Sequence, residues 1–301
     1  MKVAVAGASG LIGSAVVPHL QSRGHLVYRL VRRPVRDAAA EIEWHPETGA
    51  VEPVALAGFD VIINLAGENI GEGRWSEERK RRIRDSRVET TRLLAGLCAA
   101  LDPQPKAFLS ASATGYYGDT GERAVDESAQ AGDTFLADVC RQWEEAAQPA
   151  AEAGIRVVNF RLGVVLSRQG GMLHKILPLF RLGLGGRLGD GRQYLPWVTL
   201  EDVARAFEYF ITNEPIRGPV NVVAPQPVTN AEFTQALGAA LQRPTLFRVP
   251  AGVIRAVFGQ MGRETILSGC RAVPARLSTQ GFRFKHADLV DTLRAELDRP
   301  G

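Results

Sequence analysis

Three glycines at regular three-residue spacing give the clearest chemical signal in the sequence: Gly7, Gly10 and Gly13. They follow a short valine-rich run and precede an amphipathic segment, so the pattern predicts a turn from a β-strand into an α-helix. In such a turn the first glycine permits the bend, the second lets backbone approach a pyrophosphate, and the third lets helix and strand pack closely. The N–H groups at the helix start attract the anion. We therefore predict dinucleotide binding by Gly7, Ser9, Gly10, Leu11, Ile12 and Gly13.

Two arginines stand at the end of the second predicted strand, where an NAD site usually carries an acidic residue for the ribose hydroxyls. This sequence has Arg32 and Arg33 there, followed by Pro34. Guanidinium groups pair with phosphate through forked, charge-assisted hydrogen bonds. The alternative is that both arginines are solvated surface residues. We expect them to bind a 2′-phosphate, so the preferred cofactor is NADP(H) rather than NAD(H).

A parallel sheet is needed to position these residues. Over the first two-thirds of the chain, short runs rich in valine and isoleucine alternate with longer amphipathic segments, which is typical of βαβ units. We predict strands over residues 2–6, 26–31, 61–65, 107–110 and 157–162, and helices over residues 11–23, 77–100 and 133–153. The expected fold class is α/β, a Rossmann doubly wound parallel sheet with a smaller, mostly helical C-terminal substrate lobe.

The last third of the sequence supplies that smaller lobe. The glycine-rich run 183–191 is expected to be a flexible connection. We predict one more strand at residues 220–223 and helices at residues 201–212, 230–241, 251–261 and 287–297. We assign residues 1–165, with the returning strand 217–224, to an NADP-binding Rossmann domain, and residues 166–216 and 225–301 to the substrate lobe.

Composition argues against several classes of protein. Of the 301 residues, 45% are hydrophobic and 23% are charged, as in an ordinary globular protein. The formal net charge of +3 falls short of the basic surface that nucleic acid requires. The three cysteines have no spacing typical of a disulfide framework or a zinc site, so we expect no metal and a cytoplasmic location. No apolar run is long enough for a membrane span, and we expect no membrane partner.

With these motifs in hand, the chain resembles the extended short-chain dehydrogenase/reductase superfamily, in its NAD-dependent epimerase/dehydratase group. It is similar to the sugar-nucleotide epimerase-like subfamily that has a C-terminal domain of unknown function. The resemblance covers nearly the whole chain. Its motifs are VAGASGLIG at the start, NLAGENI at 64–70, RW at 74–75, SRVETT at 86–91, SASATGYYG at 110–118, FLADVC at 135–140 with WE at 143–144, RLGVVL at 161–166, and the segment 221–233.

The resemblance implies further cofactor contacts. It places Leu65, Ala66 and Gly67 along the adenosine and pyrophosphate half, and Arg87 near the phosphates, with a surface ion pair as the alternative for this arginine. It places Ser110, Ala111 and Val165 along the nicotinamide half. Two more residues are implied on the cofactor side of the fold: Cys140 and Arg161.

The resemblance also implies a catalytic arrangement that this sequence lacks. Such enzymes use a serine or threonine with a Tyr-x-x-x-Lys helix motif, in which the tyrosine exchanges a proton. Ser112 and Thr114 occupy the serine region, but Leu136 stands at the tyrosine position and Cys140 at the lysine position. Tyr116 is the candidate for a substitute phenol, with Tyr117 beside it, and packing next to glycines is the alternative role of both.

Two functions from different classes remain open. The first is an NADP(H)-dependent epimerase or oxidoreductase that acts on a small polar substrate, with a nucleotide sugar as one candidate. The second is an NADP(H)-sensing regulator or assembly protein without catalysis. For the first, the resemblance implies substrate contacts from the second lobe: Arg187, Arg192, Tyr194, Pro196 and Trp197, with His174 and Lys175 as further polar candidates. The expected state is a monomer or a homodimer.

Overall fold

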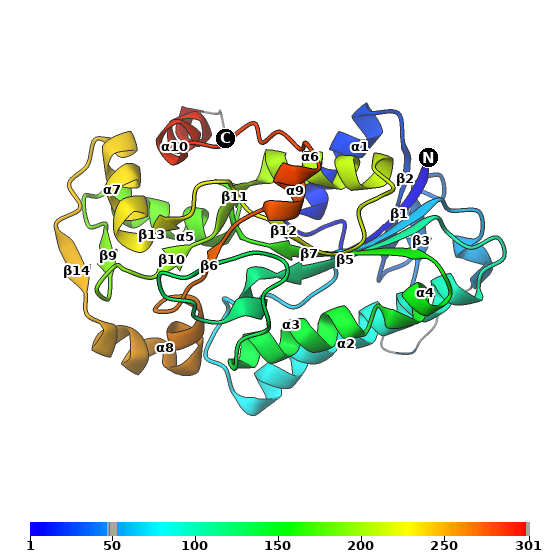
Figure 1. The fold of residues 1–301 in the computed structure, drawn as a ribbon, viewed down its shortest axis with the longest axis horizontal. Helices are drawn as coiled ribbons and strands as arrows, with labels where there is room; N and C mark the ends of the chain where they lie inside the picture. The colour runs from blue at the N-terminus through cyan, green and yellow to red at the C-terminus, as the bar shows by residue number, and fades with distance from the viewer. Residues whose placement is uncertain (47, 49–52, 299–301) are drawn as a thin grey trace.

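A seven-stranded parallel sheet forms the N-terminal part of the protein (Figure 1). The structure is a computed structural model and describes residues 1–46, 48 and 53–298. The strand order is β12-β7-β5-β4-β1-β2-β3, and each neighbouring pair is parallel. The strands are β1 Lys2–Ala6, β2 Leu26–Val31, β3 Glu41–Glu43, β4 Val61–Asn64, β5 Ala107–Ala113, β7 Arg156–Leu162 and β12 Gly218–Val222. From β1 the order runs outward in both directions, so a ligand crevice is expected between β1 and β4.

Helices cover both faces of this sheet (Figure 1). One face carries α1 (Gly13–Ser22) and α6 (Leu200–Thr212), and the other carries α2 (Glu77–Ala100), α3 (Phe135–Glu145) and α4 (Gln148–Glu152). Successive residues of β1 pack against the helices on opposite faces of the sheet, since side chains of a strand point to the two faces in turn. Val3 and Val5 pack in one core with Phe207 of α6, whereas Ala4 packs in the other with Leu94 of α2. Burial on both sides explains why the strands are continuously apolar.

The C-terminal lobe is mostly helical. Its helices are α5 (Gly171–Arg181), α7 (Asn230–Leu241), α8 (Ala251–Thr265), α9 (Ala275–Thr279) and α10 (Leu289–Asp298). Four two-stranded sheets connect them: β8 (Val164–Leu166) with β11 (Trp197–Thr199), β9 (Gly186–Leu188) with β14 (Phe247–Val249), β10 (Tyr194–Leu195) with β13 (Val228–Thr229), and β6 (Ala124–Val125) with β15 (Arg271–Ala272). In the part of the chain that is described, no helix is long and apolar enough to cross a membrane. The predicted fold class is confirmed.

Two predictions about local structure are wrong in part. The single helix expected at 133–153 is divided into α3 and α4. Pro149 lies in the first turn of α4, where its missing N–H costs nothing, whereas inside one long helix its ring would clash with the carbonyl of residue 145. The run 183–191, expected to be a flexible connection, contains β9. A Cβ at Gly186 would lie 2.0 Å from the carbonyl oxygen of Phe247, so this glycine allows two backbones to pair closely.

Candidate cofactor site

The loop between β1 and α1 is shaped by two glycines. Gly7 has φ +75°, and a Cβ on it would lie 2.6 Å from the carbonyl carbon of Leu65. A Cβ on Gly13, the first residue of α1, would lie 2.5 Å from the carbonyl oxygen of Gly7. Ser9 and Gly10 between them are exposed. The first and third glycines therefore hold the turn against its neighbours, and the middle of the loop remains accessible to a ligand.

A cavity of about 710 Å³ opens in front of this loop, at the ends of β1, β2 and β4. Its remaining walls come from one face of α2 and from Glu41, Trp44 and Pro46, in and after β3. The segments that line the cavity are far apart in the sequence. The cavity lies at the carboxyl ends of the strands, which is where open parallel sheets bind their ligands. Eight of the predicted cofactor residues line it: Gly7, Ser9, Gly10, Arg32, Arg33, Leu65, Ala66 and Gly67. Leu11, Ile12 and Gly13 continue from the loop into the start of α1.

The two predicted phosphate-binding arginines differ in their surroundings. Arg33 forms a two-point ion pair with Glu41 of β3, Nη2 to Oε1 at 2.7 Å and Nη1 to Oε2 at 3.0 Å. Its Nη1 also donates to the carbonyl of Pro34. The bonds to Arg33 and to the backbone N–H of Arg36 lower the pKa of the Glu41 carboxyl to about 2. Three of the five donors of Arg33 are thus already engaged, and its charge is balanced by a carboxylate.

Arg32 and Arg29 are the accessible cations of this corner. Arg32 is exposed, lines the cavity and makes no hydrogen bond or ion pair with a described residue. Arg29, on β2, also lines the cavity, and its buried Nε has no hydrogen-bond partner among the residues described. A buried donor without a partner is costly, which fits a site that a ligand completes. Sequence reasoning missed Arg29 because it lies inside a predicted strand.

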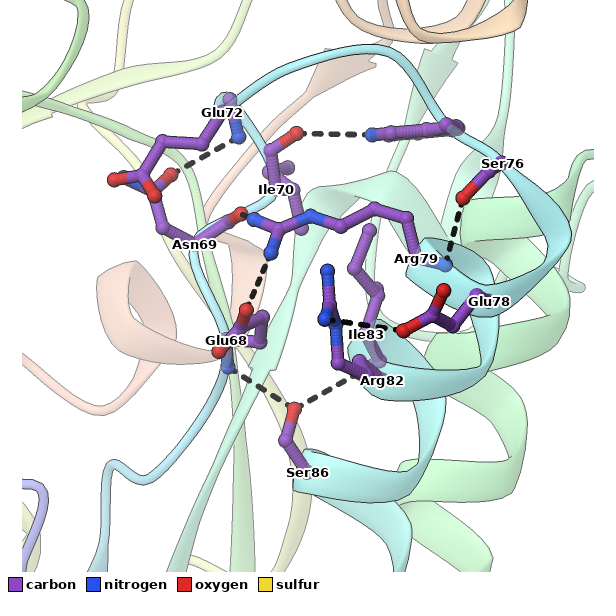
Figure 2. Close-up of polar contacts among 12 residues, drawn as sticks. Glu68, Asn69, Ile70, Glu72, Ser76, Glu78, Arg79, Arg82, Ile83 and Ser86 are labelled. Atoms are coloured by element: carbon purple, nitrogen blue, oxygen red, sulfur yellow. Dashed lines mark hydrogen bonds and ion pairs between the residues drawn. The ribbon is translucent and has the colours of Figure 1, made fainter.

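The loop after β4 covers residues 65–76, and its first residues, 65–68, form the opposite wall of the cavity. Hydrogen bonds fasten this loop to α2 (Figure 2). The Ser86 Oγ accepts a hydrogen bond from the backbone N–H of Glu68 at 3.0 Å and donates to the carbonyl of Ile83. Arg79 reaches across from α2 and donates to the Glu68 carboxylate and to the Asn69 carbonyl. These bonds fix the loop before any ligand arrives.

Arg87 lies behind this loop. Its Nη1 donates to the carbonyl of Ile83 and its Nη2 to the carbonyl of Glu68, each at 2.9 Å. A Cβ on Gly67 would lie 3.2 Å from the Arg87 Cζ. Burial lowers the pKa of the Arg87 guanidinium. Arg87 therefore supports the cavity wall in this structure, and its contact with cofactor phosphates stays a prediction.

Ser112, the predicted catalytic serine, belongs to a buried charged network. Its hydroxyl donates to Glu144 Oε1 at 2.7 Å, and its exposed fraction is 2%. Arg161 of β7 binds both oxygens of the same carboxylate, Nε to Oε1 at 2.8 Å and Nη2 to Oε2 at 2.9 Å. Arg161, predicted to touch the cofactor, therefore serves to hold Glu144 in this structure. In the sequence, Glu144 stands out only as part of the WE motif at 143–144.

The tyrosines after β5 lie against the same arginine. The Arg161 Cζ is 3.5 Å from the centre of the Tyr116 ring, and its Nη1 donates to the Tyr117 hydroxyl at 3.0 Å. The Tyr117 hydroxyl in turn donates to Asn221 Oδ1 at 2.6 Å. Burial raises the pKa of Tyr117 to about 12, so this phenol stays protonated. Thr114 donates to the carbonyl of Leu162.

The helix α3 brings apolar side chains to the positions where the resemblance would place tyrosine and lysine. Leu136 and Cys140 lie against Gly115, 3.5 and 3.9 Å from where its Cβ would be. Leu136 packs in an apolar cluster with Trp75 and Met261. Burial raises the pKa of the Cys140 thiol to about 12, so it is a protonated packing residue and a poor nucleophile.

The C-terminal lobe reaches the start of this helix. Glu264 of α8 accepts the backbone N–H of Leu136 at 3.0 Å and that of Phe135 at 3.4 Å. A carboxylate at a helix N-terminus satisfies N–H groups that have no partner within the helix. This contact could not be predicted from the sequence, because the two segments are more than 120 residues apart.

The remaining nicotinamide-side predictions fall on buried strands. Ser110 and Ala111 lie inside β5, and the Ser110 hydroxyl donates to the carbonyl of Ala111 at 3.3 Å. Val165 is half-buried on β8 and pairs with Val198 of β11. None of the three lines the cavity in front of the glycine loop. Their cofactor contacts stay predictions.

The predicted substrate residues are divided between surface and core. Pro196 and Trp197 are buried, and the Trp197 indole donates to the carbonyl of Gln226, so these two are core residues in this structure. Arg192 is exposed and pairs with Glu122. The other polar candidates are Arg187, exposed on β9; Tyr194, half-buried on β10; His174, bonded to the Arg168 carbonyl; and Lys175, bonded to the Gly71 carbonyl.

Comparison with known sequence families places this chain. The model of the NAD dependent epimerase/dehydratase family matches residues 3–223. The chain belongs to this family. A second model, a domain of unknown function, matches residues 249–296. The resemblance drawn from the motifs is thereby confirmed.

Similar proteins cover the whole chain. An epimerase family protein of Mycobacterium tuberculosis is 47% identical over 99% of this chain and 98% of its own length. The crystal structure of human epimerase family protein SDR39U1 with NADPH has a TM-score of 0.92 at 35% identity, covering 99% of this chain and 100% of that one. A nucleoside-diphosphate sugar epimerase structure from Corynebacterium glutamicum has a TM-score of 0.82 at 36% identity, covering 99% of this chain and 58% of that one.

Proposed function

We propose that this protein binds NADP(H) in the cavity between the glycine loop, the end of β2 and the loop after β4. The observation that carries the proposal is the cavity, which joins an open main-chain turn to a corner with two accessible arginines. The human relative SDR39U1 was crystallised with NADPH, which supports the same cofactor here. We also propose a division into a cofactor domain, 1–165 with 217–224, and a substrate lobe, 166–216 and 225–301, except that α6 packs in one core with Val3 and Val5 and therefore belongs with the cofactor domain. The proposed location is cytoplasmic.

The residues present fit such a cofactor. The exposed Ser9 and Gly10 suit main-chain contact with the pyrophosphate, as predicted for a GxxGxxG turn. Arg32 and the orphaned Nε of Arg29 suit the two extra charges of a 2′-phosphate. Glu41 would repel that phosphate if its charge were free, but Arg33 balances it. Bound NADP(H) supplies a hydride donor or acceptor.

Calorimetric titration of the purified protein with NADPH and NADH tests this proposal. We expect NADPH to bind at least tenfold more tightly than NADH, because only NADPH presents the phosphate. Absence of binding by both cofactors would overturn the proposal. Equal affinity for the two would retain the cavity but remove the role of the arginines.

We further propose that the protein is an epimerase or oxidoreductase acting on a small polar substrate, with nucleotide sugars as the candidate class. The Ser112 hydrogen is engaged with Glu144, so this hydroxyl offers lone pairs that accept a hydrogen bond from a substrate hydroxyl. Arg161 holds the carboxylate in the orientation that fixes the serine. The relative from Corynebacterium glutamicum bears the name of a nucleoside-diphosphate sugar epimerase, which supports this substrate class.

A second candidate function is an NADP(H) sensor without catalysis. It is favoured by Leu136, which packs with Trp75 and Met261 where the resemblance would place a proton-exchanging tyrosine. The burial of Ser112 points the same way.

Hydride chemistry separates the two. The assay follows epimerisation of a panel of nucleotide sugars in the presence of NADP⁺, and deuterium transfer from C4-deuterated NADPH to keto-sugar nucleotides and other carbonyl compounds. Either reaction, reduced in a Ser112→Ala variant that still binds NADPH, supports the enzyme. Tight NADPH binding with neither reaction, accompanied by a changed proteolysis pattern, supports the sensor.

A further inference from the structure

An apolar surface is exposed at the outer end of the C-terminal lobe, away from the cofactor cavity. Leu246 is 90% exposed and Phe247 is 54% exposed at the start of β14. Leu182 and Leu184, which follow α5, are 73% and 51% exposed. We call these four residues the β14 surface. They are four of the eleven large exposed apolar side chains among the described residues, and a cluster of this kind marks an interaction site.

The two segments of the β14 surface lie side by side. β14 pairs in parallel with β9, which begins two residues after Leu184. The Arg243 Nε donates to the carbonyl of Arg181 at 2.9 Å, which ties the segment before β14 to the end of α5. In Figure 1, β14 is the outermost strand of this lobe, at the left margin.

β14 is also a free sheet edge. Its sheet has two strands, and among the described residues β9 is its only neighbour. The carbonyl of Val249 accepts the backbone N–H of Gly189, so Val249 turns its backbone groups toward β9. Because successive residues of a strand alternate, Arg248 turns its N–H and carbonyl outward. An exposed row of this kind pairs readily with a strand from another chain.

The two segments that form the β14 surface carry charge of one sign. Residues 171–189 and 233–263 contain no Asp or Glu. Arg181, Arg243 and Arg248 lie in these segments, and none of them forms an ion pair with a described residue. A second copy of the chain would bring the same arginines together across a twofold axis, which disfavours self-pairing. A lipid surface would satisfy the charge but would leave the outward N–H and carbonyl of Arg248 without partners.

We propose that the β14 surface binds an extended, acidic and apolar segment of another protein, which adds a strand to β14. Its apolar side chains cover Leu246 and Phe247, its carboxylates face the arginines, and its backbone pairs with Arg248. A three-residue edge with a small apolar patch suits a transient, micromolar complex. The proposal is independent of the proposed function.

The test uses the full-length protein and a fluorescein-labelled nine-residue peptide that alternates valine with glutamate. The matched probe alternates valine with lysine. By fluorescence polarisation we expect the glutamate peptide to bind at least tenfold more tightly, and to weaken severalfold as NaCl rises from about 50 to about 300 mM, since surface ion pairs are screened by salt.

Variants separate side-chain, charge and backbone effects. Leu246→Ser with Phe247→Ser is expected to weaken binding tenfold or more. Arg248→Gln removes the charge and the bond from Nε to the Gly189 carbonyl but keeps the backbone N–H, and it is expected to weaken binding two- to fivefold. Arg248→Pro also removes the outward N–H and is expected to abolish binding. The control Leu26→Ser changes a leucine that is 66% exposed on β2 and should leave binding intact. Retained circular dichroism shows that each variant is folded.

Three outcomes overturn the proposal. The first is equal affinity for the two peptides, or no binding of either. The second is capture of the protein by phosphatidylserine vesicles, lost in the Leu246 and Phe247 variant, while the peptide does not bind. The third is a doubled mass in light scattering that the same variant returns to the monomer value.

Discussion

Arg33 and Glu41 meet in a two-point ion pair in the wall of the proposed cofactor cavity, with Nη2 to Oε1 at 2.7 Å and Nη1 to Oε2 at 3.0 Å. The same carboxylate accepts the backbone N–H of Arg36 at 2.9 Å. The Glu41 carboxylate therefore holds the segment between β2 and β3 in place by hydrogen bonds. Arg33 therefore has mainly a structural role, whereas the neighbouring Arg32 is accessible to a ligand in the cavity.

Arg32→Gln and Arg29→Gln should each lower NADPH affinity roughly 10- to 100-fold, because a hydrogen bond to a charged group contributes about 1.5–3 kcal/mol. NADH affinity should change less than twofold, since NADH has no phosphate at this corner. Calorimetry on both cofactors measures the ratio. The nearby exposed Arg36→Gln is the matched control. Equal losses for NADPH and NADH would show that neither side chain recognises the phosphate.

Glu41→Gln should reveal a stability contribution that depends on pH. The folded pKa of Glu41, about 2, lies below its usual value of 4.5, so the stabilisation is fully present above about pH 4.5 and is lost as pH falls toward 2. The wild-type advantage in urea unfolding should therefore be constant from pH 5 to 7 and shrink below pH 4.5. An advantage that grows on acidification would contradict this assignment.

Arg161→Leu should destabilise the protein by about 3–5 kcal/mol, because it leaves the Glu144 carboxylate buried without its partner. The double variant with Glu144→Leu should be less destabilised than the sum of the two single changes. Urea unfolding of the four proteins forms the test. Additive losses would mean that the two side chains do not depend on each other.

Gly13→Ala should abolish cofactor binding and lower the melting temperature, since its Cβ would lie 2.5 Å from the carbonyl oxygen of Gly7. The matched control is Gly96→Ala in the C-terminal part of α2, where a Cβ would meet nothing within 4 Å. That change should stabilise the helix by up to about 1 kcal/mol. Thermal unfolding and calorimetry should separate the two variants clearly; similar behaviour would refute the steric account.

The sequence predicted elements well where one local rule decided them. The limits of α2 matched because Ser76 caps the helix, acids occupy its first turn and apolar residues recur at helical spacing. The glycine loop was predictable for the same reason. β9 was not, because its partner β14 lies 60 residues further along and the glycines that permit their pairing resemble a linker.

Side-chain pairing was harder to foresee than backbone structure. Arg32 and Arg33 look equivalent in the sequence, but a three-residue strand places Glu41 against only one of them. The resemblance to epimerases predicts Trp197 at the substrate, yet this residue is only 1% exposed. In both cases a contact with a distant segment decided the role.

The carboxylate of Glu264 closes the start of α3 from the opposite lobe. If the chain were severed before α8, the N–H groups of Phe135 and Leu136 would lose their acceptor, and Leu136 would lose its packing against Met261. The segment that matches the domain of unknown function, residues 249–296, is thus a structural part of the fold around α3. It satisfies two N–H groups at the start of the helix on which the resemblance would place the catalytic tyrosine and lysine, so we expect its removal to destabilise α3.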